Sequence, residues 1–343
     1  MPLVPVMGQQ TMRALELRAY DGVSLVHVNN RPVPTPGPGE VLVRVHSTPV
    51  SAADLLFLHG RYGAPRPLPV IPGLECSGMV VQAGSGLLAR ALVGRRVACS
   101  AAGRPDGTWA EYVCVSARTC IPLRSFIGFE QGASLLSSGI AAWALMDLAR
   151  ARGSMAIAHT AGDSALGKML AQLGLRRKVP MLHVIERAEQ GEALAGLGAT
   201  QILNSSTTLY PQQLAAAFEN LGISVVVEAN AGPHTDLLLR ALPPGGTMLV
   251  CGSQPEADCT IDPSEIIFGR KKMEGFILSD WLARTSYARA VQAGLVVQRI
   301  LSSEVRTEST AKLPLDSYHK ALDLMFRGRV NDGQVMFSLL RAT

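Results

Sequence analysis

The run Met155-Ala-Ile-Ala-His-Thr-Ala-Gly-Asp-Ser-Ala-Leu-Gly167 decides the fold of this chain of 343 residues. An apolar stretch from Met155 to His159 leads directly into a turn bounded by Gly162 and Gly167, and an Ala/Leu-rich segment follows. This order predicts a strand, a phosphate-binding turn and a helix. The first glycine permits the tight turn, and the last allows helix and strand to pack closely. Free N–H groups and the positive dipole end at the start of the helix suit a pyrophosphate.

Strands and helices alternate from about residue 132 onward. Predicted helices cover residues 131–150, 165–173, 188–197, 210–220 and 234–242. Predicted strands cover residues 155–159, 180–185, 201–203, 224–228 and 247–251. Such βαβα alternation indicates a parallel, doubly wound sheet of the Rossmann kind. We therefore assign residues 132–302 to a dinucleotide-binding domain.

The first third of the chain has the pattern of a compact β domain. The stretch Glu40–His46 has a period of two directly after the Pro-Gly-Pro-Gly turn at Pro36–Gly39. Further strands are expected at residues 77–83, 95–99, 108–115, 303–305 and 334–339, and a helix after about residue 285. Residues 1–131, to which residues 303–343 return, thus form a β domain split around the Rossmann domain, with a cleft between the two.

The end of the second Rossmann strand, Val184-Ile185-Glu186-Arg187, bears on the ribose of the dinucleotide. An acid at this place accepts hydrogen bonds from a ribose 2′-hydroxyl, as in NAD sites, whereas an arginine pairs with a 2′-phosphate, as in NADP sites. This chain has both side by side. The alternative is that Glu186 and Arg187 are two solvated charges at the start of a helix.

Composition narrows the class of protein. The net charge of +5 comes with only 5% aromatic residues and no Lys/Arg run longer than Arg270–Lys272, so we expect no nucleic-acid partner. Six cysteines without a Cys-x-x-Cys pair indicate reduced, mostly buried thiols and no structural zinc. No apolar run reaches the ~20 residues of a membrane helix, and Met1–Thr11 lacks a signal-peptide pattern. A cytoplasmic enzyme is the natural setting.

A tyrosine on a glycine-anchored turn, in Gly60-Arg61-Tyr62, precedes a proline-rich loop that ends in Gly73-Leu74-Glu75. A zinc enzyme of similar layout would carry Gly-His-Glu at the latter place. The missing imidazole points away from metal-polarised alcohol oxidation and toward hydride chemistry that needs no metal.

These motifs give the chain a resemblance over nearly its full length. The chain is similar to the zinc-free branch of the medium-chain dehydrogenase/reductase superfamily, which holds quinone oxidoreductases and 2-enoyl thioester reductases. The segments that carry the likeness are residues 36–45, 54–78, 107–115, 161–167 and 242–252, and Gly275–Trp281 after Ile266–Phe268. The resemblance implies an α/β protein with a GroES-like catalytic domain, an inserted Rossmann domain, and a homodimer formed through the Rossmann sheets. The chain departs from the family at Ser51, Ser138 and Ala141, where asparagine, asparagine and threonine are common, and at Glu186, where close relatives often carry arginine.

The resemblance also implies roles for particular residues. Tyr62 is expected to be catalytic, and Ser51, Ile277 and Trp281 to contact substrate. The cofactor is expected to contact Gly162, Asp163, Ser164, Ala165, Leu166, Gly167, Glu186, Arg187, Asn230, Gly252, Ser253, Phe276 and Leu278. No metal ligand is expected. The alternatives are a Tyr62 that packs against the cofactor without chemistry and a Trp281 that anchors the core.

The implied reaction is hydride transfer from NADH or NADPH to the β-carbon of an enoyl thioester, a CoA ester in the first instance. Tyr62 suits it because a phenol is protonated at neutral pH. The sequence supports NADH and NADPH as cofactor almost equally. It favours NADH slightly, because the carboxylate of Glu186 would repel a 2′-phosphate. The alternatives are an NAD(P)H quinone oxidoreductase, which takes a flat quinone, and a dinucleotide-binding protein that has lost catalysis.

Overall fold

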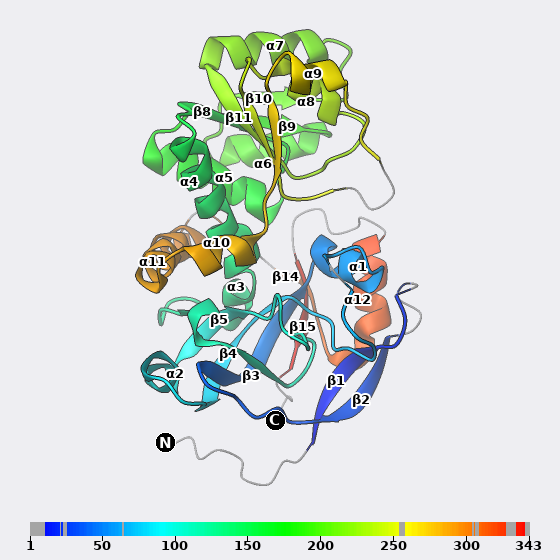
Figure 1. The fold of residues 1–343 in the computed structure, drawn as a ribbon, viewed down its shortest axis with the longest axis vertical. Coiled ribbons are helices and arrows are strands. Elements are labelled where there is room, and N and C mark those ends of the chain that lie inside the picture. The colour runs from blue at the N-terminus through cyan, green and yellow to red at the C-terminus, as the bar shows by residue number, and fades with distance from the viewer. Residues whose placement is uncertain are drawn as a thin grey trace. The chain divides into compact units, whose positions relative to one another are not determined.

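A computed structural model describes residues 11–20, 22, 26–63, 65–253, 258–303, 305, 309–326 and 334–339. The chain divides into two compact units (Figure 1). Unit 1 consists of Met1–Leu136, Leu282–Ser302 and Arg306–Thr343, and unit 2 of Ser137–Trp281 and Ser303–Val305. In the part of the chain described, no helix combines the length and the apolar composition needed to cross a membrane.

Unit 1 is built on a seven-stranded sheet. Its order is β14-β15-β3-β4-β5-β7, and β6 pairs with β3. The strands are β3 (Glu40–Val50), β4 (Glu75–Ala83), β5 (Arg96–Ser100), β6 (Tyr112–Ser116), β7 (Cys120–Pro122), β14 (Ser309–Leu313) and β15 (Gln334–Ser338), beside a separate pair, β1 (Thr11–Leu17) and β2 (Val26–Pro32). The helices are α1 (Ala52–Leu58), α2 (Leu87–Leu92), α3 (Phe129–Ala133), α11 (Tyr287–Ser303) and α12 (Tyr318–Phe326).

The period of two in β3 explains how this sheet closes over a core. Val41, Val43 and Val45 are fully buried in one apolar cluster, whereas Arg44 between them is exposed. Alternate residues of a strand point to opposite faces, so one face of β3 is apolar throughout. The strand predicted at Glu40–His46 is therefore present, and it runs on to Val50.

Unit 2 is a six-stranded, wholly parallel sheet in the order β10-β9-β8-β11-β12-β13. Its strands are β8 (Ala156–His159), β9 (Met181–Ile185), β10 (Ile202–Asn204), β11 (Ile223–Glu228), β12 (Thr247–Val250) and β13 (Lys272–Gly275). Its helices are α4 (Ala141–Ala151), α5 (Ala165–Arg177), α6 (Ala188–Gly196), α7 (Tyr210–Leu221), α8 (Thr235–Ala241), α9 (Pro263–Ile267) and α10 (Leu278–Arg284), which runs past the boundary of the unit.

Helices cover both faces of this sheet. Side chains of α7 and α8, such as Phe218 and Leu239, are buried in one cluster with the strands. Ala171 of α5 and Leu194 of α6 pack with Ile185 of β9 in another. The predicted doubly wound parallel sheet is confirmed, because strands and helices alternate as expected and helices cover it on both sides.

Three predicted elements differ from the structure. Residues 131–150 are not one helix, because a π-helical stretch, Leu135–Ile140, separates α3 from α4. The strand expected from Thr108 begins only at Tyr112, since the N–H groups of Thr108 and Trp109 donate to the carbonyls of Gly73 and Pro72 instead of to a neighbouring strand. The strand expected at 303–305 is wrong at Ser303, which ends α11, and residue 304 lies outside the described residues.

The segment 282–302, which we expected in the Rossmann domain, belongs to unit 1. The amide of Gln298 explains this placement, because it accepts from Arg124 N at 2.7 Å and donates to Pro122 O at 3.2 Å. The hydroxyl of Tyr287 donates to Cys120 O at 3.0 Å. Side chains of helix α11 thus form hydrogen bonds with backbone groups of β7 and of the loop after it.

Candidate functional site

The turn between β8 and α5 has the geometry of a phosphate-binding loop. The hydroxyl of Ser164, the N-cap of α5, accepts a hydrogen bond from Gly167 N at 3.2 Å. Gly162 has a φ of +53°, which favours glycine. A Cβ on Gly167 would lie 2.0 Å from Gly162 O, so no larger residue fits. Asp163 lies in this turn, and Ala165 and Leu166 are the first two residues of α5, whose leading N–H groups have no acceptor within the helix.

Gln190 joins this loop to the end of β9. Its Oε1 accepts from Glu186 N at 2.9 Å and from Arg187 N at 3.1 Å. Its Nε2 donates to the carboxylate of Asp163 at 2.7 Å. The sequence analysis missed Gln190, although a glutamine three residues into a helix is a known capping signal. The exposed side chains of Glu186 and Arg187 are therefore attached to a backbone that is fixed relative to the phosphate loop.

A buried carboxylate lies at the end of β11. Glu228 accepts at Oε1 from the hydroxyl of Thr160 at 2.6 Å and from Asn230 N at 2.8 Å. Asn230 Nδ2 donates to Thr160 O at 3.0 Å. Burial raises the pKa of Glu228 above its usual range. This network, of which only Asn230 was predicted, holds the ends of β8 and β11 together.

Two histidines on the neighbouring strands β8 and β9 are buried next to each other. The Nε2 of His159 lies 2.6 Å from the Nδ1 of His183. Burial lowers the pKa of His183 to about 4, and burial followed by the neighbouring ring lowers that of His159 well below its usual value. Both rings are therefore neutral at neutral pH, and one donates a hydrogen bond to the other.

A small pocket opens between the ends of β8, β9, β10 and β11. It encloses about 30 Å³. Its lining combines carboxylates, hydroxyls and apolar groups: Thr160, Val184, Glu186, Ser205, Tyr210, Glu228, Asn230, Pro233, His234, Thr235 and Leu238. Glu186 and Glu228 are acidic, and none of these described lining residues is lysine or arginine.

The remaining residues predicted for unit 2 follow β12 and β13. A Cβ on Gly252 would lie 2.3 Å from Ala229 O, and Ser253 forms a bridge with Ala231. Phe276 N donates to Val250 O at 2.8 Å. Farther along, Ile277 is exposed, Leu278 begins α10 and Trp281 is half-buried within it. The predicted residues after β8, β9, β11 and β12 thus share the carboxyl edge of one parallel sheet, where such sheets bind ligands.

In unit 1, Ser51 and Asp54 form the N-terminal cap of α1. Ser51 N and Oγ donate to Asp54 Oδ2 at 2.8 and 2.6 Å, and Leu74 N donates to Asp54 Oδ1 at 3.1 Å. Burial raises the pKa of Asp54 to about 6, although these hydrogen bonds lower it. The hydroxyl of Ser51 is thus held by the protein itself, and its contact with substrate stays a prediction.

The loop that carries Tyr62 is shaped by close contacts. Gly60 has a φ of +68°, and a Cβ there would lie 3.2 Å from the Cβ of Tyr20. The hydroxyl of Tyr20 donates to Arg66 O at 2.9 Å and accepts from Arg66 N at 2.8 Å. Tyr62 is half-buried and packs against the apolar core of unit 1. Leu74, at the place of the zinc-binding histidine, is buried, and the described residues include no group of three or more His, Cys, Asp and Glu that could hold a metal ion.

Two family descriptions match the two parts of this architecture. The alcohol dehydrogenase GroES-like domain matches residues 37–125, and the zinc-binding dehydrogenase domain matches residues 165–294. The chain belongs to the medium-chain dehydrogenase/reductase superfamily. The predicted α/β fold, a GroES-like domain with a Rossmann domain, is confirmed.

Similar proteins cover nearly the whole chain. Quinone oxidoreductase of Rattus norvegicus is 25% identical over 321 residues, which are 92% of this chain and 96% of that protein. Mitochondrial enoyl-[acyl-carrier-protein] reductase of Mus musculus is 24% identical over 323 residues, 92% and 86% of the two chains. The crystal structure of a proposed NADPH:quinone reductase from Mesorhizobium loti superposes with a TM-score of 0.84 at 28% identity, covering 96% and 98%.

Proposed function

We propose that this NAD(P)H-dependent oxidoreductase reduces the α,β double bond of an enoyl thioester. The observation that carries the proposal is the glycine-shaped loop that holds Tyr62 in a chain with leucine in place of the zinc-binding histidine. The mouse enoyl reductase, which acts on an acyl carrier protein thioester by its name, matches 92% of the chain. The Mesorhizobium loti and rat relatives, named for quinones, favour quinone reduction as the second candidate.

Each part of the chain has a task in this reaction. A reduced dinucleotide held at the phosphate loop would supply the hydride for the β-carbon, and the electron pair of the double bond would then reside on the thioester oxygen as an enolate. The phosphate loop from Gly162 to Gly167 binds the pyrophosphate. We assign to Tyr62 the hydrogen bond that stabilises the enolate oxygen and then the transfer of its phenolic proton to the α-carbon, after which the phenolate regains a proton from water.

Turnover of two substrates under the same conditions separates the two candidates. We expect crotonyl-CoA to oxidise NADH at a kcat/KM about tenfold or more above that of 1,4-benzoquinone, because an acyl thioester uses binding energy that a quinone lacks. Absorbance at the nicotinamide band measures both rates. A benzoquinone rate above the crotonyl-CoA rate would establish the quinone reductase, and cofactor binding without oxidation by either substrate would indicate a protein that has lost catalysis.

We propose NADH as the preferred cofactor, since Glu186 and Glu228 line the pocket at the ribose end of the site and Arg187 does not. A Glu186→Gln variant should use NADPH about tenfold better and NADH severalfold worse, because it loses a repulsive charge and a charge-assisted hydrogen bond. Steady-state kcat/KM for each cofactor is the measurement. Glu189→Gln is the matched control, an exposed carboxylate three residues farther along the chain, in the first turn of α6 and outside the pocket. A wild-type preference for NADPH would contradict this assignment.

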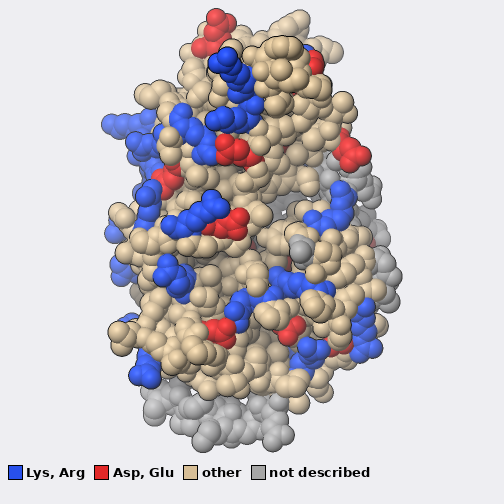
Figure 2. Space-filling view, viewed as in Figure 1, with Lys and Arg blue, Asp and Glu red and all other residues tan. Residues whose placement is uncertain are grey.

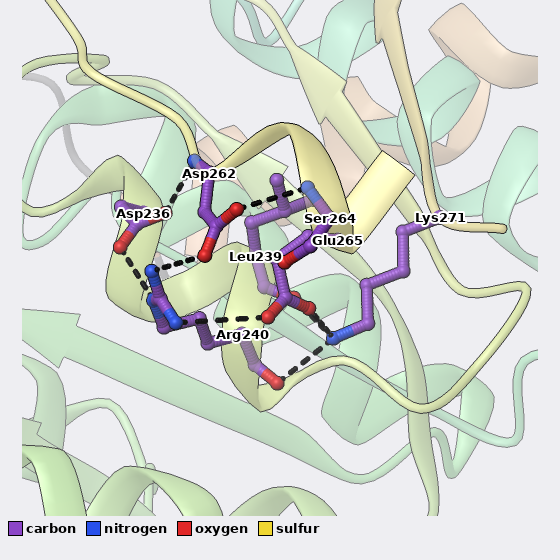
Figure 3. A network of polar contacts seen from close by, with 7 residues as sticks. All are labelled: Asp236, Leu239, Arg240, Asp262, Ser264, Glu265 and Lys271. Atoms are coloured by element: carbon purple, nitrogen blue, oxygen red, sulfur yellow. Dashed lines mark hydrogen bonds and ion pairs between the residues drawn. The ribbon is translucent and has the colours of Figure 1, made fainter. Parts of the chain in front are cut away.

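We further propose a homodimer through the outer strand of the Rossmann sheet. Strand β13 ends the sheet order, and Ile267 and Phe268, just before it, are 63% and 81% exposed. A polar network fixes this segment (Figure 3). Lys271 Nζ donates to Glu265 Oε2 at 2.6 Å and to the carbonyls of Leu239 and Arg240. Apolar side chains held this rigidly beside an open sheet edge suit a second copy of the chain.

Replacing Phe268 with glutamate should convert the dimer to a monomer, because the substitution would place a charge in an apolar interface. Light scattering after size exclusion gives the mass. Phe126→Glu, a similar change at a 54% exposed phenylalanine of unit 1, should leave the mass unchanged. A wild-type protein that is monomeric at micromolar concentration would contradict the proposed dimer.

The face shown in Figure 2 carries both basic and acidic side chains. On the face shown in Figure 2, Lys and Arg side chains lie among Asp and Glu and form no continuous band. Among the described residues, several cations are paired with carboxylates, such as Arg240 with Asp236 and Asp262. The view therefore gives no support to a nucleic-acid partner.

A further inference from the structure

We propose that unit 1 carries a second ligand site, separate from the cofactor site, for a compact carboxylate with an apolar body. The site is a cavity of about 370 Å³ between β1, the end of β2, β6 and the loops around Thr35 and Asp106. This volume falls within the ~300–1,000 Å³ of typical small-molecule sites. No residue that lines it is one that we expect to contact the dinucleotide or the thioester.

The walls of the cavity are apolar and preformed. Met12, Ile71 and Val113 are buried at its base, and Tyr112 adds an aromatic ring. Three further lining residues are prolines, whose rings fix the backbone φ angle. Binding of a ligand therefore requires little ordering of the protein, so little of the binding free energy is lost as conformational entropy.

The acidic groups of the cavity have their oxygens occupied by protein donors. Glu40 accepts from Gly37 N at 2.9 Å through Oε2 and from Arg104 through Oε1. Asp106 accepts from Ile71 N at 3.0 Å through Oδ1, and its Oδ2 lies 3.7 Å from the guanidinium of Arg31. Neither carboxylate has both oxygens open to a cationic ligand.

The arginines, in contrast, have donors to spare. Each guanidinium carries five N–H groups. Arg104 uses an Nη2 hydrogen for Glu40, and its Nε–H is buried without a hydrogen-bond partner. Arg31 donates to Glu16 at 2.8 Å from Nη1. Because each guanidinium makes fewer hydrogen bonds here than it has N–H groups, and because guanidinium binds carboxylates in a planar fork, a carboxylate on an apolar body fits this wall.

Octanoate is the probe, and octanamide of equal length is its neutral comparator. We expect octanoate to bind at one site per chain by calorimetry and to shift the methyl resonance of Met12 in ¹³C-labelled protein. Octanamide should bind about tenfold more weakly, since it lacks the charge. Saturating NADH should leave the octanoate affinity unchanged. Equal affinities for the two probes, no binding of octanoate, or competition with NADH would each overturn the proposal.

Variants locate the site. Arg104→Gln should weaken octanoate about tenfold or more, whereas Arg118→Gln, at an exposed arginine of unit 1 outside the cavity, should not. If Arg104→Gln fails to fold, Thr35→Trp serves instead, because Thr35 is an exposed loop residue at the cavity and a large ring there would fill it. Octanoate affinity unchanged in the folded variant would overturn the site. Since NADH oxidation by crotonyl-CoA is measured without octanoate, this outcome is independent of the proposed reaction.

Discussion

A Tyr62→Phe variant should lose about a hundredfold or more in kcat with crotonyl-CoA, the usual contribution of a positioned general acid. The phenylalanine ring keeps the contact that Tyr62 makes with the core of unit 1. The loop should also keep its path, because the φ of Gly60 and the hydrogen bonds between Tyr20 and Arg66 do not involve the Tyr62 hydroxyl. The loss should therefore fall on kcat, with the dissociation constant of NADH unchanged.

Tyr287→Phe is the matched control for this experiment. It also removes one phenolic hydroxyl from unit 1, and that hydroxyl donates to Cys120 O at 3.0 Å. The free energy of unfolding should fall by about 1 kcal/mol, the value of one hydrogen bond, and kcat should stay the same. If Tyr62→Phe retained full kcat with normal NADH binding, Tyr62 would be a packing residue, and another group would have to supply the proton.

The sequence sufficed for five of the six strands of the parallel sheet because their signals are local, whereas β13 was not predicted. Strand β8, the turn with Gly162 and the start of α5 lie within a few residues of one another, and each follows from composition and spacing. The same holds for β9 and β11, whose apolar runs begin after Pro180 and Gly222 and end in Glu186 and Glu228. Their carboxyl ends then share one edge by topology, so the neighbourhood of Glu186 and Asn230 could be anticipated.

Contacts between distant residues could not be anticipated in this way. Gln190 reaches Asp163 across 27 positions, and Thr160 reaches Glu228 across 68. Nothing in the local pattern of either partner indicates the other. The placement of α11 has the same origin, because the bond between Gln298 and Arg124 spans 174 positions. Such partners become visible only when the sheets have brought them together.

The second large effect concerns Gly167. We expect Gly167→Ala to raise the dissociation constant of NADH about a hundredfold and to lower the free energy of unfolding by about 3 kcal/mol, as overpacking does at a tight site. The added Cβ would lie 2.0 Å from Gly162 O, a backbone atom that no side-chain rotation can move. Helix α5 would have to retreat from the loop, and its N–H groups would move away from the pyrophosphate. Fluorescence titration with NADH and denaturant unfolding measure the two effects.

Gly196→Ala makes the same chemical change where space is open. Gly196 is the last residue of α6, has no positive φ, and a Cβ there would meet no heavy atom within 4 Å. This variant should therefore be more stable by about 0.5 kcal/mol, since alanine loses less backbone entropy in a helix, with NADH affinity unchanged. Equal behaviour of the two variants would mean that α5 can shift without cost. In that case the close approach of Gly167 to Gly162 would not be needed to bind the dinucleotide. The start of helix α5 would still be needed.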